Sequence, residues 1–418
     1  MKIKALALLA CSLAITPWVQ AEDWPWFRGP SRQGVSTETG LPLQWSASSN
    51  ILWKVEVPGE SWSSPIVHGD KVFVSTALDG GVKCHVIGYD KKSGKEIWNT
   101  HVFDQVPLRK EGKNSYATPT PATDGKLVYA VFGDGSIVAL DSDGKVKWTW
   151  REFKFYSQHG LGASPLLHDD LLIMPFDHSS TGENKRVGWQ LPWDKSFLIA
   201  LDKNTGKQKW KTMRGQSRIA HVTPNVMKHD GKTILVSGAG DVIQGYDIQT
   251  GERLWNVYSQ GEGVVPSIVV GEALIYSVSG YEKPTIRAVK PGGKGDVTET
   301  HIAWEQKKGV PALPSMIYKK PHLFAITEGG VATCMEAATG NIIWQERIGG
   351  NHSASPILAE NRIYFTSEEG ETTAIEAGSE FKILGRSKLN EKTQASPAVS
   401  DKTIFIRTAK NLYAIGKK

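Results

Sequence analysis

The chain has 418 residues, of which 40% are hydrophobic and 22% charged, and its formal net charge is +6 at pH 7. This length and apolar content allow one large domain built from repeated units, with a core buried between stacked sheets. The positive charge is mild and forms no block of Lys and Arg. It therefore argues against nucleic-acid and membrane-surface binding, which need a concentrated basic face.

Residues 1–21 have the composition of a secretory signal peptide. Two lysines precede an apolar run over residues 5–15, and a small-residue cleavage site follows at 19–21. An alternative interpretation makes Cys11 the lipid-bearing residue of a lipobox, but the apolar run before it is short. The run is also shorter than the roughly 20 residues of a transmembrane helix. We expect an exported, periplasmic or secreted protein whose mature chain begins at Glu22.

Residues 22–49 show little periodicity and are rich in aromatic residues and proline, above all at 24–30 and 41–45. We expect an extended segment, anchored by its aromatic side chains, that wraps around the folded domain. A docking peptide for a partner is the alternative.

One pattern recurs from residue 50 to the C-terminus. In its clearest copy, an apolar strand leads to Asp202, whose carboxylate can accept bonds from the backbone of a turn. Gly206 then supplies a positive φ, and Trp210 lies in the next strand. Two weaker copies exist, one reaching Trp304 after a Gly-rich insertion and one at 373–376 without tryptophan. The glycines and tryptophans of the five clear copies are Gly94 and Trp98, Gly144 and Trp148, Gly206 and Trp210, Gly251 and Trp255, and Gly340 and Trp344.

A second motif precedes each copy: a proline after a small, hydroxyl or apolar residue, then apolar residues, a polar turn and a β-rich run. Four short strands per unit, repeated every 40 to 60 residues or so, are typical of a β-propeller. We predict an all-β fold with eight four-stranded antiparallel blades, or seven if one weak copy is not a blade. The prolines of this motif are Pro65, Pro119, Pro165, Pro224, Pro266, Pro314, Pro356 and Pro397.

The two ends of the repeat region complement each other. The last unit stops at Ile415 without a tryptophan strand, while an unassigned strand containing Trp53 precedes the first proline motif. We expect this N-terminal strand to complete the last blade, which closes the ring and leaves only short outer edges. The propeller then spans residues 50–418.

Two insertions interrupt the units. Residues 101–116 join the outer strand of one blade to the inner strand of the next, and residues 177–195 join the middle strands of the third blade. Strands alternate in direction within a blade, so both insertions should emerge on one face. We take that face as the functional one because binding residues accumulate on loops of a rigid scaffold; neutral surface insertions are the alternative.

The segments that precede the inner strands should rim the central channel. Their polar and aromatic side chains could bind an anionic or aromatic small molecule, with Arg218 for a carboxylate and Trp62 or Tyr116 for stacking. A channel mouth that is merely solvated is the alternative. The candidate residues are Glu60, Trp62, Asn114, Tyr116, His159, Arg218, His221, His352 and Gln394.

The usual catalytic and metal-binding signatures are missing. The sequence has no phosphate loop, no dinucleotide fingerprint, no Gly-x-Ser-x-Gly elbow and no Cys-x-x-Cys or His-Glu-x-x-His spacing. We therefore assign no catalytic or metal-binding residue. Cys84 and Cys334 lie in the first and sixth units, which a ring keeps apart, so we expect two buried free thiols.

The pattern Ala-x-Asp-x-x-Thr-Gly-Lys-x-x-Trp at Ala200 to Trp210 resembles the tryptophan-docking repeat of pyrroloquinoline-quinone (PQQ)-type propellers, from about Trp24 to the C-terminus. The resemblance implies an eight-bladed propeller whose tryptophans wedge between adjacent blades. The same repeat occurs in quinoprotein dehydrogenases and in non-enzymatic relatives similar to BamB, the outer-membrane assembly lipoprotein. The implied wedge residues are Trp53, Trp98, Trp148, Trp210, Trp255, Trp304 and Trp344.

Three departures separate this sequence from the dehydrogenase branch that the resemblance describes. Those enzymes are longer, carry a vicinal Cys-Cys disulfide against the quinone, and hold calcium beside a catalytic Asp. This sequence has no adjacent cysteines, and its nearest material for a calcium site is Asn114, Asn225 and Glu60. The resemblance to BamB is incomplete too, because the opening at 24–30 is more similar to other secreted propellers of the group.

We expect an exported, monomeric, non-catalytic propeller that needs no cofactor and binds a protein or small ligand on the insertion-bearing face. The first alternative is a PQQ-dependent alcohol or sugar dehydrogenase, which would need PQQ and calcium. The second is a glycan-binding propeller that uses Trp189 and Trp193 of the 177–195 insertion as exposed stacking platforms.

Overall fold

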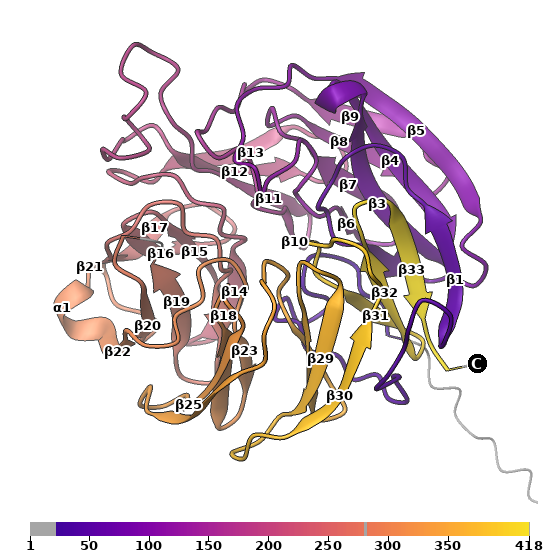
Figure 1. Ribbon diagram of the computed structural model, residues 1–418. Helices are drawn as coiled ribbons and strands as arrows, with labels where there is room; N and C mark the ends of the chain where they lie inside the picture. Colours follow the sequence, from indigo (N-terminus) through magenta and orange to yellow (C-terminus); the bar gives the residue numbers. More distant parts are fainter. Residues whose placement is uncertain (1–21, 280–281, 418) are drawn as a thin grey trace, which may run out of the picture.

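The computed structural model describes residues 22–279 and 282–417. Eight sheets, each with four antiparallel strands and one with an additional fifth strand, stand around a central axis as the blades of a β-propeller (Figure 1). The prediction of eight blades is confirmed and the seven-bladed alternative is wrong. The predicted signal peptide, its cleavage site and Cys11 lie outside the described residues.

The blades follow one another in chain order, and in blades one to seven the chain runs from the inner to the outer strand. Blades one to four contain β2 (Ile66–His68), β3 (Lys71–Leu78), β4 (Lys83–Asp90) and β5 (Glu96–Asp104); β6 (Ala122–Thr123), β7 (Leu127–Val131), β8 (Ile137–Asp141) and β9 (Val146–Trp150); β10 (Leu166–His168), β11 (Leu171–Phe176), β12 (Phe197–Asp202) and β13 (Gln208–Met213); and β14 (Asn225–His229), β15 (Lys232–Ala239), β16 (Val242–Asp247) and β17 (Arg253–Tyr258). Blades five to eight contain β18 (Val269–Val270), β19 (Ile275–Ser279), β20 (Thr285–Val289) and β22 (Ile302–Gln306); β23 (Ile317–Lys319), β24 (His322–Ile326), β25 (Val331–Glu336) and β26 (Ile342–Arg347); β27 (Ile357–Ala359), β28 (Arg362–Thr366), β29 (Glu371–Glu376) and β30 (Ile383–Lys388); and β31 (Ala398–Ser400), β32 (Thr403–Arg407), β33 (Asn411–Ile415) and β1 (Ile51–Glu56). The remaining elements are β21 (Gly295–Asp296), the helix α1 (Thr298–His301) and a 3-10 turn at Asp79–Gly81.

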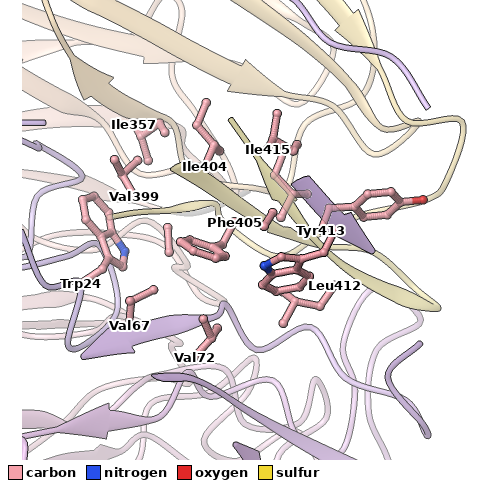
Figure 2. Packing of buried hydrophobic residues seen from close by; sticks show 14 of the residues in the cluster. Trp24, Val67, Val72, Ile357, Val399, Ile404, Phe405, Leu412, Tyr413 and Ile415 are labelled. Carbon is pink, nitrogen blue, oxygen red and sulfur yellow. The ribbon is translucent and has the colours of Figure 1, made fainter. Parts of the chain in front are cut away.

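The N-terminal strand closes the ring, as predicted. β1 pairs antiparallel with β33, with Val55 opposite Leu412, and forms the outer strand of blade eight. Behind this joint, Phe405 and Leu412 of blade eight share a buried cluster with Val72 of blade one and Trp24 (Figure 2). The two ends of the propeller are therefore held by backbone bonds and by apolar burial.

Most of the repeat tryptophans dock onto the turn of the next blade. The indole N–H of Trp98, on β5, donates to the carbonyl of Ser142 in blade two at 3.0 Å. Gly144 of that turn has φ +79°, and a Cβ there would lie 2.6 Å from the Trp98 ring. Only glycine meets both demands, which explains the fixed spacing of the repeat. Equivalent bonds join Trp53 to Lys91, Trp148 to Lys203, Trp210 to Ile248, Trp304 to Ala337 and Trp344 to Gly378.

Trp255 differs from the other tryptophans. It is buried between blades four and five with Val289 and Val297, but its indole N–H has no partner among the described residues. The Gly-rich insertion replaces the docking turn of blade five, and its strand β21 pairs in parallel with β17, setting Gly295 opposite Trp255. Blade four therefore carries a fifth strand where its neighbours have a tryptophan hydrogen bond.

The segment after residue 22 crosses one end of the channel. Trp24 exchanges two backbone bonds of 2.9 Å with Val67 on β2, and Arg32 donates to the Leu167 carbonyl on β10 at 2.6 Å. Farther along, the Leu358 N–H on β27 donates to the carbonyl of Gly34 at 2.7 Å. Val67, Leu167 and Leu358 each lie on an inner strand, two residues after the proline of the repeat motif. Residues 60–62 precede that proline, so the N-terminal segment covers the opposite end of the channel.

Cys84 in blade one and Cys334 in blade six are buried free thiols, as predicted. Within residues 22–279 and 282–417, no helix has the length and apolar character to cross a membrane.

Candidate functional site

Eight hydroxyl side chains form a ring inside the channel, one just before each inner strand. The backbone N–H of Ser64 donates to the Thr120 hydroxyl of the next blade at 3.0 Å, and the N–H of Ser396 donates to Ser64 at 3.1 Å. Seven of the eight neighbouring pairs are linked in this way, so the ring ties the blades together at the axis. Its members are Ser64, Thr120, Ser164, Thr223, Ser267, Ser315, Ser355 and Ser396.

The ring corrects the alignment of the proline motif in three blades. In blades two, five and six the channel position belongs to Thr120, Ser267 and Ser315, two residues after the position that the proline indicated. In blade two, successive Thr-Pro pairs gave two possible alignments. In blades five and six, the residue after the hydroxyl side chain is Ile268 or Met316, so no proline marks the channel position in the sequence.

A cavity of about 490 Å³ occupies the channel around this ring. Residues of all eight blades line it, Phe27 of the N-terminal segment borders it, and Glu111, Lys113 and Asn114 of the 101–116 insertion stand at its other end. The 177–195 insertion reaches the same end, because Trp189 makes an edge contact with His159, a lining residue, at 6.1 Å between ring centroids. Both insertions therefore border one mouth of the cavity.

Five of the nine candidate residues line this cavity: Trp62, Asn114, His159, His221 and Gln394. Arg218, the residue expected to bind a carboxylate ligand, lies outside the lining. Its guanidinium makes two bonds of 2.7 Å to Asp241 and one of 2.9 Å to Glu282. These acids already occupy its donors, and the bonds to Asp241 raise the pKa of Arg218.

The other three candidates also lie outside the cavity lining. The carboxylate of Glu60 lies 3.3 Å from the Lys110 ammonium, and the ring of Tyr116 packs against Gly81. His352 is buried, with its Nε2 bonded to the Gly349 carbonyl at 2.9 Å.

His159 and His221 lie side by side in the channel, with ring centroids 6.0 Å apart. Burial, with a smaller contribution from His159, lowers the pKa of His221 to about 3, and burial also lowers the pKa of His159. Both imidazoles are therefore neutral at pH 7. The Nδ1 of His221 has no hydrogen-bond partner in the described part of the chain.

The cavity also contains acidic residues that the sequence patterns did not indicate. Glu111, Glu262 and Glu328 all belong to its lining. An Oε atom of Glu262 is buried beside the Trp189 side chain without a hydrogen bond of regular geometry among the described residues, and burial raises the pKa of this carboxyl. The signal was available, because Glu262 lies four residues before Pro266, in the same kind of segment that supplied the other candidates.

The stacking platforms proposed for a glycan are only half exposed. Trp189 contacts His159, while Trp193 packs edge-on against His178, with ring centroids 5.0 Å apart, and its backbone pairs with Ser217. The indole N–H of Trp189 is buried beside the Glu262 carboxyl.

The donors around the cavity do not fit PQQ with calcium. Asn225 donates to the Ile268 carbonyl, Asn114 donates to the His159 carbonyl, and Glu60 faces Lys110, so these three side chains are already engaged with protein partners. No group of three His, Cys, Asp or Glu within 22–279 and 282–417 has the geometry of a metal site. PQQ is a tricarboxylate, whereas the cavity lining contains three glutamates and one lysine.

A family model described as "Outer membrane protein assembly factor BamB" matches residues 31–151, 193–298 and 282–418. The chain belongs to this family of PQQ-like β-propellers. It is 22% identical to a tetrathionate hydrolase from Acidithiobacillus ferrooxidans over 77% of this chain and 52% of that protein. It is 24% identical to a BamB from Nitrosomonas eutropha over 62% of this chain and 58% of that protein.

Among solved structures, the quinohemoprotein alcohol dehydrogenase of Comamonas testosteroni superposes with a TM-score of 0.65 at 11% identity, over 95% of this chain and 81% of that one. This likeness shows the shared fold. The chain spans only about half the length of the two sequence relatives. The family thus includes an assembly factor and enzymes on one scaffold, and the site must decide between them.

Proposed function

We propose that this chain is an exported, non-catalytic propeller that binds a partner or ligand at the cavity mouth on its insertion-bearing face. The observation that carries the proposal is the asymmetry of the channel. The N-terminal segment crosses one end with Phe27 inward, whereas the other end is bordered by two insertions and by polar atoms without partners among the described residues. A concave site with a few convergent polar groups is the default place for binding.

The relatives support a binding role and leave the chemistry open. An outer membrane assembly factor gives the family model its name, and its position in the cell matches the export that residues 1–21 predict. The quinone-dependent alternative needs a lining that attracts a tricarboxylate, and three glutamates beside one lysine would repel it.

Photocrosslinking in the exporting cell tests the binding role. A benzoylphenylalanine at Leu191, which is 39% exposed on the 177–195 insertion, should form a discrete adduct that dissociates with neither salt nor detergent. The control is the same substitution at Ile383, which is 40% exposed on the outer strand β30. Equal adducts at both positions, or none at Leu191, would contradict the proposal.

Thermal unfolding with PQQ and Ca²⁺ tests the non-catalytic part. A ligand of the native state at a hundred times its dissociation constant stabilises by about 2.7 kcal/mol. We expect no shift of the unfolding midpoint and no reduction of a dye with alcohols or sugars. A clear shift together with dye reduction would establish the quinoprotein alternative.

A further inference from the structure

The segments that carry Glu111 and Glu262 both contact His159 at the cavity mouth. The backbone N–H of Glu111 donates to the carbonyl of His159 at 3.1 Å, and Gly263, next to Glu262, packs against the His159 ring. Both glutamates line the cavity, one from the 101–116 insertion and one from the segment before blade five. The ring fold therefore brings together two acids that lie far apart in the sequence.

The charges of the lining are unbalanced. Lys113 is the one basic residue in the lining, and its ammonium lies 2.9 Å from Glu368 and 3.6 Å from Glu328. The single lysine of the lining is thus already shared by two carboxylates. Two further cations border the lining, because Lys110 donates to the Asn114 carbonyl at 2.8 Å and the Lys392 ammonium lies 5.6 Å from the centroid of the Trp62 ring. Glu111 and Glu262 are the remaining carboxylates of the lining. An oxygen of Glu262 is buried beside the Trp189 side chain and makes no hydrogen bond of regular geometry within the described residues. A buried carboxylate oxygen without such a bond favours a ligand that brings a donor.

Two further side chains point to a ligand rather than to a solvated surface. His221 is 8% exposed and Gln394 is 7% exposed, and both line the cavity. The Nδ1 of His221 lacks a hydrogen-bond partner among the described residues, whereas the Gln394 amide lies beside the Glu368 carboxylate and helps to lower its pKa. Buried polar groups in native proteins are normally paired, so the Nδ1 of His221 predicts that a bound molecule completes it. Because both imidazoles are neutral, they do not repel a cation.

We propose that this cavity binds a primary alkylammonium group, held between the carboxylates of Glu111 and Glu262 with Gln394 and His221 as further hydrogen-bond partners. The inference rests on the proposed binding role of the insertion-bearing face and names its ligand chemistry. The ammonium supplies three donors and one positive charge, which is what a carboxylate-rich mouth lacks. It could belong to a free amine or to a lysine side chain of a partner.

Calorimetric titration of the folded chain with molecules of similar length tests this chemistry. We expect 1,5-diaminopentane to bind at least tenfold more tightly than 1,5-pentanediol, and glutarate not to bind. Equal affinity for the diol would assign the cavity to neutral polyols, and tighter binding of glutarate would assign it to anions; either result overturns the proposal, as does a diamine that does not bind.

An acetylated and amidated Gly-Lys-Gly peptide distinguishes the two sources of the ammonium. Tighter binding of the peptide than of the diamine identifies a lysine of a protein partner, whereas tighter binding of the diamine identifies a free amine. Both outcomes support the ammonium chemistry and assign its origin.

Matched variants locate the binding. Glu262→Gln keeps the shape of the side chain and removes its charge, and it should weaken diamine binding at least fivefold. Glu346→Gln removes an exposed charge from the outer strand β26 and should leave binding unchanged. Equal losses in both variants would show that the diamine responds only to net charge. If Leu191 still forms its crosslink while no diamine binds, the ammonium inference fails and the binding role remains.

Discussion

Trp53 of β1 donates its indole N–H to the carbonyl of Lys91 at 2.9 Å, so the strand that completes blade eight is docked onto blade one. The same side chain packs on Phe405, with ring centroids 5.9 Å apart. Closure of the ring therefore depends on a side chain that precedes all the inner strands in the sequence.

Trp53→Ala should destabilise the propeller by about 3–5 kcal/mol, because it removes a buried aromatic ring and leaves a cavity at the closure. Urea unfolding followed by tryptophan fluorescence measures the change. A loss below about 1 kcal/mol would show that the β1–β33 backbone pairing alone closes the ring.

The tryptophan hydrogen bond can be isolated by comparing Trp98→Phe with Trp255→Phe. Both changes shrink a side chain between blades, but only Trp98 donates a hydrogen bond to the next blade. We expect Trp98→Phe to cost about 1 kcal/mol more, the usual contribution of one hydrogen bond. Equal losses would mean that ring packing alone accounts for the docking.

Arg407 of β32 joins blade eight to blade one from within the core. It is 1% exposed and donates to the Ser75 carbonyl at 2.6 Å and to the Thr76 hydroxyl at 3.3 Å. Burial lowers its pKa to about 10, which leaves it charged at pH 7.

Arg407→Ala should destabilise the protein by at least about 2 kcal/mol, because hydrogen bonds from charged groups contribute roughly 1.5–3 kcal/mol. Arg347→Ala is the control, since Arg347 donates to a carbonyl from an exposed position, and it should change stability by less than about 0.5 kcal/mol. Chemical unfolding of both variants checks the difference, and a similar small effect for both would contradict it.

His221 should make the propeller sensitive to acid. Its pKa is about 3 in the folded chain against an ordinary value of 6.5, so between these values the unfolded chain binds the extra proton. The contribution of His221 to the free energy of unfolding is therefore complete above pH 6.5, and it decreases by about 1.4 kcal/mol for each pH unit below 6.5.

Unfolding free energies of the wild type and of His221→Gln, measured from pH 7 to pH 4.5, isolate this contribution. The two curves should converge as the pH falls, because glutamine does not titrate. Parallel curves would show that the imidazole is protonated equally in both states.

The two thiols should not react in the native protein. Burial raises the pKa of Cys334 to about 12 and raises that of Cys84 as well, so neither forms a thiolate near neutral pH. A chain beginning at Glu22 should release no colour from Ellman's reagent when folded and two equivalents in urea. Reaction of either thiol without denaturant would contradict the burial.

Architecture was the part of this protein that local patterns could predict. Asp202, Gly206 and Trp210 have the spacing that a β-turn followed by a docking tryptophan requires. Each further copy of the pattern supports the same interpretation. The closure was also predictable, because the last unit stops at Ile415 without a tryptophan strand and an unassigned strand with Trp53 precedes the first unit. The site was predicted less well, since five of nine candidates line the cavity and its glutamates were passed over.

The sequence by itself determined the all-β class, the docking glycines and the closing strand, and it favoured eight blades over seven, because these features depend on short-range spacing repeated along the chain. Only the tertiary structure decided which side chains are engaged and which face the cavity. Arg218 is neutralised by Asp241 and Glu282, while the Nδ1 of His221, a lining residue, has no partner among the described residues. The reason is physical: a channel side chain takes its partners from other blades and loops, and those neighbours are brought together only when the ring closes.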